Sequence, residues 1–193
     1  MYVSTRRNAT RAMRQTLLVL LAASLAMLAV IGTARADDMS FSRYGLNSGD
    51  KVKITVFGEE DMEVETRLSD AGTISYPFLG EIRVKGKTVG QLQNFLTQKL
   101  TGDYFIDPKV SVAITEYRKF FVSGEVKDPG GFSFEPGLTL EKAVALAGGF
   151  TQRASRKDII VSREEKGKLV ERAMKLDESV LPGDIINVKE SFF

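Results

Sequence analysis

Apolar and polar residues alternate over several short segments of this chain, which is the pattern of half-buried β-strands. Val52, Ile54 and Val56 alternate with polar residues, and the same alternation returns at residues 110–115. We therefore expect a chain made mostly of strands. The further predicted strands are at residues 62–66, 73–76, 82–84, 120–122, 132–134, 159–161, 169–174 and 185–188.

Two segments instead repeat apolar residues with the 3.6-residue period of a helix. Residues 89–100 form the first, and Thr88 and Gln91 have the spacing of a capping box at its start. Residues 140–147 form the second, with Thr139 as the expected N-cap. Glycine commonly ends helices by adopting a left-handed conformation. The glycines expected to do so here are Gly102, Gly148 and Gly149.

A glycine followed by an aspartate precedes both the first and the last predicted strand. The two pairs are Gly49-Asp50 and Gly183-Asp184. Glycine permits a positive φ, and the aspartate side chain can cap the turn through a backbone hydrogen bond. A metal ligand or a catalytic acid is the alternative interpretation, but a turn cap is favoured. The repetition suggests two similarly built units.

The first 36 residues have the organisation of a secretory signal peptide. Arginines precede an apolar run at residues 17–31, and Ala34-Arg35-Ala36 has the form of a cleavage site. We expect cleavage between Ala36 and Asp37, and therefore an exported protein. An uncleaved membrane anchor is the alternative, but the run is shorter than a membrane span of roughly 20 residues.

Charge and composition exclude several classes of function. The chain has 27 Lys and Arg against 25 Asp and Glu, and five of the arginines lie in the leader with no acidic residue. The remaining chain therefore carries 22 against 25, a net charge of −3, which removes the support for nucleic acid binding. Because the chain has no Cys and no His, disulfides, thiol nucleophiles, the usual catalytic triads and the usual zinc sites cannot form.

The acidic run at residues 59–65 is a candidate for sugar hydrolysis, which needs two facing carboxyl groups at a defined separation. A solvated loop between two strands is the favoured interpretation of this run.

Lysines at 85, 87 and 109 are candidates for contact with an acidic polysaccharide, although ordinary surface charge is favoured. Phe120 and Phe121 are adjacent, so both cannot face one core, and one of them is a candidate interface residue. These five candidate contact residues are Lys85, Lys87, Lys109, Phe120 and Phe121.

With these elements in order, the first unit resembles the export domain of the polysaccharide biosynthesis/export proteins, which are outer-membrane export auxiliary proteins. The second unit resembles the soluble-ligand-binding β-grasp module of the same family. The resemblance rests on the order of the turn motifs, since each motif alone is common. The residues that carry it are Gly49, Asp50, Asp70, Gly72, Pro77, Gly80, Asp107, Pro108, Gly124, Pro129, Gly130, Gly148 and Gly149.

The resemblance implies an α+β fold in which a signal peptide at 1–36 precedes two domains. A polysaccharide export domain at 44–117 has short strands around one helix, and a β-grasp-like domain follows at 119–189. The implied protein is periplasmic, is associated with the outer membrane and serves the export of exopolysaccharide or capsule. Copies of the chain would form a ring-like, passive conduit for the polysaccharide. No enzyme activity and no cofactor is expected.

Two departures from the family determine the expected partners. Lipid-anchored members have a cysteine after the leader, and longer members continue into a membrane-crossing helix; this sequence has neither before Phe193. We therefore expect a protein without a lipid anchor that works with an outer-membrane β-barrel protein and an inner-membrane polysaccharide co-polymerase. The strongest alternative is a monomeric periplasmic module that binds a glycan or another ligand. An enzyme acting on glycan ranks third.

Overall fold

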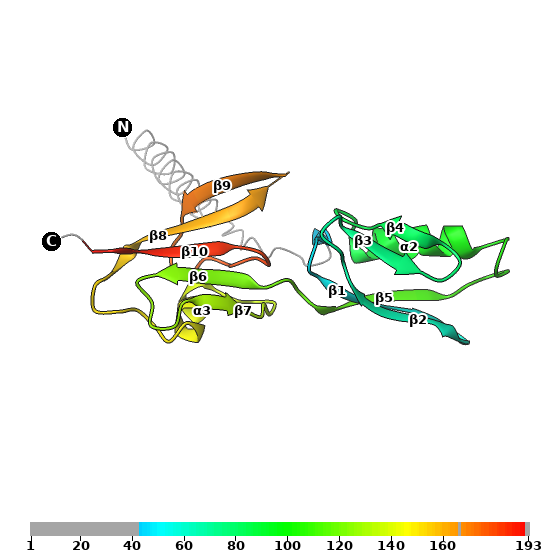
Figure 1. Ribbon diagram of the computed structural model, residues 1–193, viewed down its shortest axis with the longest axis horizontal. Coiled ribbons are helices and arrows are strands. Elements are labelled where there is room, and N and C mark those ends of the chain that lie inside the picture. Colours follow the sequence, from blue (N-terminus) through cyan, green and yellow to red (C-terminus); the bar gives the residue numbers. More distant parts are fainter. Residues whose placement is uncertain (1–42, 166, 192–193) are drawn as a thin grey trace, which may run out of the picture. The chain divides into compact units, whose positions relative to one another are not determined.

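The computed structural model describes residues 43–165 and 167–191, whose helices and strands are drawn in Figure 1. The predicted leader and its cleavage site at Ala36 and Asp37 lie outside the described residues. Within the described ranges, no helix has the length and apolar character needed to cross a membrane. Strands β1 to β10 predominate over helices α2 and α3, which confirms the predicted α+β class.

The N-terminal half is built on a three-stranded antiparallel sheet in the order β2-β1-β5. β1 (Lys51–Val56) lies between β2 (Glu59–Arg67) and β5 (Val110–Glu116). Along β1, buried apolar residues alternate with half-buried polar ones, as the sequence pattern predicts. The central strand therefore presents one face to the core.

A hairpin and a helix complete this half. The hairpin pairs β3 (Thr73–Tyr76) with β4 (Gly80–Arg83) in antiparallel register. Helix α2 (Val89–Leu100) begins with the predicted capping box. The Thr88 hydroxyl accepts from the Gln91 backbone N–H at 3.2 Å, and the Gln91 side chain accepts from the Thr88 backbone N–H at 3.0 Å. The helix start is therefore fixed by two residues of local sequence.

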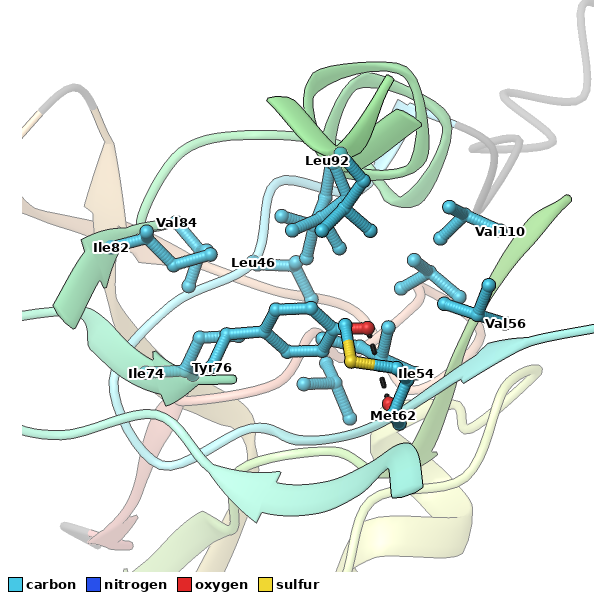
Figure 2. Packing of buried hydrophobic residues seen from close by; sticks show 14 of the residues in the cluster. Leu46, Ile54, Val56, Met62, Ile74, Tyr76, Ile82, Val84, Leu92 and Val110 are labelled. Carbon is cyan, nitrogen blue, oxygen red and sulfur yellow. Dashed lines mark hydrogen bonds between the residues drawn. The ribbon is translucent and has the colours of Figure 1, made fainter. Parts of the chain in front are cut away.

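A hydrophobic core joins the sheet, the hairpin and α2. Figure 2 shows the ring of Tyr76 among aliphatic side chains, with its hydroxyl donating to the Met62 carbonyl oxygen at 3.1 Å. This bond satisfies a phenol that is otherwise buried, and burial raises the pKa of Tyr76. The buried residues of this core are Leu46, Val52, Ile54, Val56, Met62, Leu68, Ile74, Tyr76, Ile82, Val84, Leu92, Leu96, Leu100, Val110 and Val112.

The acidic run is part of β2, so the prediction of a solvated loop is wrong. β2 begins at Glu59, directly after a tight turn, and lies at the edge of the sheet. Glu63 and Glu65 form ion pairs of 2.8 Å with Lys53 and Lys51 on the neighbouring strand. Cross-strand pairing of opposite charges lets an edge strand carry many acids, and charged edges also resist unwanted strand pairing.

The C-terminal half has a five-stranded mixed sheet in the order β7-β6-β10-β8-β9. β6 (Phe120–Gly124) is parallel to β10 (Ile185–Glu190), and the other neighbours are antiparallel. The remaining strands are β7 (Gly130–Phe132), β8 (Ala154–Glu165) and β9 (Lys168–Ala173). Figure 1 shows β6 and β10 side by side in the middle of this sheet.

Helix α3 (Leu140–Leu146) lies between β7 and β8 in the chain. The Thr139 hydroxyl accepts from the Lys142 backbone N–H at 3.4 Å, which confirms the predicted N-cap. Gly148 and Gly149 follow with φ values of 74° and 85°, so the predicted glycine stop is also confirmed. A Cβ atom at Gly148 would overlap the Asp128 carboxylate, and this close approach adds a steric requirement to the conformational one.

A second hydrophobic core fills the C-terminal half, and its residues come from positions 120–188, whereas those of the first come from 46–112. Two separate hydrophobic cores therefore lie within the described residues. The unit bounds at 44–117 and 119–189 and the β-grasp assignment remain predictions. The buried residues of the second core are Phe120, Val122, Val126, Phe134, Leu138, Leu140, Ala143, Val144, Ala147, Ile159, Val161, Met174, Val180, Ile186 and Val188.

Candidate functional site

A hollow of about 380 Å³ opens on the surface of the N-terminal half. Three segments far apart in the sequence form it: the start of β2, the turn between β3 and β4, and the loop after α2. Two exposed aromatic rings and three carboxylates dominate its lining. The lining residues are Glu59, Asp61, Met62, Pro77, Phe78, Asp103, Tyr104 and Phe105.

The two exposed rings of the hollow stack on each other. The ring centroids of Phe78 and Tyr104 are 5.0 Å apart, with an angle of 22° between the ring planes. The Tyr104 hydroxyl lies 3.4 Å from the Phe78 carbonyl oxygen. Although the rings contact each other, Phe78 is 64% exposed and Tyr104 is 44% exposed. The pair therefore offers aromatic surface to a ligand.

Phe78 has an uncommon backbone conformation. It is the only described residue other than glycine with a positive φ, which is 62°. The backbone N–H of Leu79 donates to the Pro77 carbonyl oxygen at 2.7 Å, so Phe78 is the centre of a γ-turn. The γ-turn with positive φ is the rarer and more strained form. A bulky residue thus occupies a position that glycine would occupy with less strain.

The first Gly-Asp pair forms a closed structural cap. Gly49 has a φ of 91°, and Asp50 is fully buried. The Asp50 carboxylate accepts from the Asn47 backbone N–H and the Arg118 backbone N–H, each at 2.8 Å, and from the Tyr44 hydroxyl at 2.7 Å. Burial raises the pKa of Tyr44 far above its usual value, and the Asp50 carboxylate raises it further. Asp50 is therefore a turn cap, as predicted.

The second Gly-Asp pair repeats the cap with a different additional partner. Gly183 has a φ of 87°, and the carboxylate of Asp184 accepts from the Leu181 backbone N–H at 2.8 Å. The Arg163 guanidinium donates to both carboxylate oxygens, at 2.8 and 2.7 Å. In both pairs the aspartate caps the residue three positions before it. The alternative of a metal or catalytic acid is not supported by these contacts.

The predicted contact residues do not line the hollow. Lys109 pairs with Asp107 at 2.8 Å, and Lys87 lies over the Phe95 ring with its nitrogen 5.1 Å from the centroid. The side chain of Lys85 packs closely over Gly72, where a Cβ atom would overlap it. Within the described residues, no contact brings these three lysines together into a common binding site.

Phe120 and Phe121 point to opposite faces of β6, as their adjacency predicts. Phe120 is fully buried, whereas Phe121 is 48% exposed. The Phe121 ring lies over Gly131 on the neighbouring strand, where a Cβ atom would be 2.8 Å from the ring. Ile185, the partner of Phe121 in the register of β10, is also exposed. Phe121 thus belongs to an exposed apolar strip of the sheet.

Comparison with known protein families finds one match in each half of the chain. Residues 39–115 match the model of the polysaccharide biosynthesis/export proteins, and residues 119–173 match the SLBB domain. The chain belongs to the polysaccharide biosynthesis/export protein family. The order of the two matches is the one expected from the turn motifs.

Three relatives of this chain have names that refer to polysaccharide production, export or transport. The chain is 32% identical to the exopolysaccharide production protein ExoF of Rhizobium meliloti (strain 1021) over 77% of its own length and 39% of the relative. It is 29% identical to the EPS I polysaccharide export outer membrane protein EpsA of Ralstonia nicotianae (strain ATCC BAA-1114 / GMI1000), over 64% of the chain and 35% of the relative. It is 27% identical to the polysialic acid transport protein KpsD of Escherichia coli, over 74% of the chain and 25% of the relative. The chain thus spans well under half the length of these curated relatives.

The residues that carry the family resemblance lie in turns or at the ends of strands and helices, and they shape the backbone. Gly72, Gly80 and Gly124 all have positive φ values, between 64° and 82°. Pro77 precedes the strained Phe78, and Pro108 is buried two residues before the start of β5. The family motif therefore specifies the scaffold. The hollow contains only one residue of the motif, Pro77, which explains why the sequence motifs did not reveal it.

The prediction that the chain is not an enzyme agrees with its family, since the relatives are described as production, export and transport proteins. Among the described residues, no group of three or more His, Cys, Asp or Glu side chains could hold a metal ion. Of the acidic residues of β2 that lie outside the hollow, Glu63 and Glu65 form ion pairs with Lys53 and Lys51.

Proposed function

We propose that this protein is a component of a machinery that exports exopolysaccharide or capsule. The observation that carries the proposal is the ordered match of both halves to the export family and the SLBB domain. The relatives described as exopolysaccharide production, polysaccharide export and polysialic acid transport proteins support the same class of function. On this assignment, residues 44–117 form the export domain and residues 119–189 form a β-grasp domain.

The proposed site of action is the periplasm, in association with the outer membrane. The signal-peptide pattern at 1–36 and the description of EpsA as an outer membrane protein support this location. The purified protein should begin at Asp37 and carry no acyl group. Intact-mass measurement and N-terminal sequencing would show this, whereas a retained leader or an added lipid would contradict the proposal.

The proposed mechanism is a passive conduit in which copies of the chain assemble into a ring. Export would be powered by other components. The Gly148-Gly149 pair is not a phosphate loop, because it lies where a helix ends, whereas phosphates bind where helices begin. The ring would align an inner-membrane polysaccharide co-polymerase with a separate outer-membrane protein. Cross-linking in cells followed by purification should recover both partners.

The exposed strip of Phe121 and Ile185 is the proposed contact between copies. Large exposed apolar side chains that lie together commonly mark an interaction surface. Replacing Phe121 with Asp should shift the protein from a ring to monomers in analytical ultracentrifugation and electron microscopy. Leu169→Asp is a matched control, because Leu169 is exposed on the edge strand β9, away from this strip. A ring that survives the Phe121 change would remove this surface from the proposal.

Gene deletion tests the function as a whole. Loss of the protein should abolish surface polysaccharide while the sugar-nucleotide precursors are still made, and a plasmid copy should restore export. If precursors also disappeared, the protein would act in synthesis. A monomeric binding module is the alternative, and it would be supported by a purified protein that binds glycan without forming a ring.

A further inference from the structure

We propose that the hollow between β2, the β3–β4 turn and the loop after α2 binds a sugar unit that carries neither a carboxylate nor a phosphate group. The inference rests on the proposed function, in which the protein handles polysaccharide, and it assigns a location and a sugar class to that contact. Three features of the hollow support it: its aromatic surface, the strain at Phe78 and its unbalanced negative charge.

The aromatic surface suits one face of a pyranose ring. A pyranose presents a patch of C–H groups on its less polar face, and an aromatic ring of similar size can cover this patch. Phe78 and Tyr104 together present such a surface, because the rings stack on each other and more than two fifths of each residue is exposed. Aromatic side chains contribute large contact areas to binding, and Tyr adds a hydroxyl for hydrogen bonds. In this hollow the Tyr104 hydroxyl has only the long 3.4 Å contact to the Phe78 carbonyl oxygen.

The strained backbone at Phe78 indicates that its aromatic ring has a role other than stabilising the fold. A positive φ is unfavourable for a bulky residue, and the side chain gains little burial in return because Phe78 is 64% exposed. Strained residues of this kind concentrate at ligand sites. Glycine at this position would fit the turn better and would lose the ring.

The charges of the hollow select the class of sugar. Glu59, Asp61 and Asp103 contribute three carboxylates, and in the part of the chain that the structure describes none of them has an ion-pair or hydrogen-bond partner. Carboxylates accept hydrogen bonds from sugar hydroxyls and attract a protonated amine. They repel uronate, sialate and phosphate groups. A volume of about 380 Å³ lies in the range of pockets for small ligands, so the hollow suits one or two sugar units.

Binding can be measured with three trisaccharides of different charge. The probes are a glucosamine trimer, a glucose trimer with β-1,4 linkages and a galacturonate trimer, titrated into the purified ¹⁵N-labelled protein. We expect amide shifts centred on Asp103 and Tyr104 for the first two probes, with the glucosamine trimer binding at least as tightly as the glucose trimer. The galacturonate trimer should bind about tenfold more weakly or not at all. Equal binding of all three probes, or shifts for none of them, would overturn the proposal.

Replacing Phe78 with Gly separates a binding role from a structural one. The affinity for the glucose trimer should fall about threefold to tenfold, as expected when one aromatic contact is lost. The melting temperature should be unchanged or higher, because glycine relieves the positive φ. A purely structural Phe78 would instead give a lower melting temperature and unchanged binding. Phe57→Ala is the matched control, since Phe57 is 87% exposed but does not line the hollow.

The charge argument has its own test. Changing Asp61 and Asp103 to Asn keeps the shape of the hollow and removes two negative charges. The galacturonate trimer should then gain affinity relative to the glucosamine trimer. An unchanged ratio would refute the assigned sugar class. Shifts at the hollow that depend on protein concentration and on no sugar would instead identify a second copy of the chain as the occupant.

Failure of this proposal can be distinguished from failure of the proposed function. Suppose that the deletion strain loses surface polysaccharide, that the Phe78→Gly gene restores it fully, and that the purified protein binds no sugar. The hollow is then not the contact with the polysaccharide, but the proposed export function is supported. If deletion leaves surface polysaccharide intact, the export function itself is wrong, whatever the hollow binds.

Discussion

Loss of either partner of the buried ion pair between Arg163 and Asp184 should strongly destabilise the C-terminal half. The Arg163 side chain is 10% exposed and the Asp184 side chain is 1% exposed, so each charge is almost fully removed from water. The guanidinium also donates to the Ser179 carbonyl oxygen at 3.2 Å. Removing one partner of a buried pair leaves the other charge unpaired and costs about 3–5 kcal/mol. An exposed pair contributes only about 0–1 kcal/mol.

A double-mutant cycle gives the sharpest test of this reasoning. Arg163→Met leaves the buried carboxylate with only its backbone donor at Leu181, and should cost about 3–5 kcal/mol. Asp184→Ala loses both the pair and the turn cap, and should lie at the upper end of the same range. The double variant has no unpaired charge and retains mainly the unsatisfied Leu181 N–H, which costs about 1–3 kcal/mol. The combined change should therefore cost much less than the sum of the single changes.

Urea unfolding followed by circular dichroism suits the measurement, because the chain has no tryptophan for fluorescence. The exposed pair of Arg172 and Glu178, 3.7 Å apart, provides the control in the same half. Its removal should cost less than about 1 kcal/mol and should matter less at high salt. If Asp184→Ala cost no more than the loss of the exposed pair, or if the two single changes added without coupling, the assigned role of this buried pair would be refuted.

Three further changes test local features of the fold. Replacing Gly148 and Gly149 together by Val should lower the melting temperature markedly, since two β-branched residues would need positive φ at about 1 kcal/mol or more each; a thermal scan with an unchanged midpoint would show that α3 ends elsewhere. Thr88→Ala should destabilise the protein by about 1 kcal/mol in urea, while Thr88→Asn, which can still cap, should stay near the starting value. The raised pKa of Tyr44 predicts stability that is fully present below the ordinary tyrosine pKa of about 10 and is lost as pH rises from there through the folded-state pKa. Tyr44→Phe should reduce that alkaline loss in unfolding curves measured from pH 8 to 12, and an unchanged alkaline loss would contradict the burial of the Tyr44 hydroxyl against Asp50.

The elements that local sequence determines were predictable. The capping box of Thr88 and Gln91, the glycine stop at 148–149 and the alternation along β1 each depend on residues within a few positions of one another. The opposite orientation of Phe120 and Phe121 follows from the two-residue period of a strand alone. In these cases the residues that determine the structure lie within one turn or one strand, so the local sequence pattern is sufficient to predict it.

The features that tertiary contacts determine were not predictable in the same way. Acids at 59–65 suggested a loop because nothing in their own segment shows that lysines at 51 and 53 would lie across from Glu63 and Glu65. The partner of Asp184 is 21 positions away, and no local signal identifies Arg163. The hollow combines three segments whose residues are unremarkable apart from Phe78 in its turn after proline. A Pro-Phe turn between two short strands is the one signal that could have drawn attention to it.

The two Gly-Asp turns show how far a motif determines a structure. In both, the aspartate accepts from the backbone N–H three positions earlier, so the local cap is the same. The two carboxylates differ in their other hydrogen bonds. Asp50 also accepts from a tyrosine hydroxyl and a second backbone N–H, whereas Asp184 accepts from a guanidinium group. The motif therefore fixes the turn and leaves the surrounding contacts to the rest of the chain. The residues that carry the family resemblance therefore shape the backbone. Under the proposed function, contacts with a polysaccharide or with a second copy would be made by exposed side chains outside the motif, such as Tyr104 and Phe121.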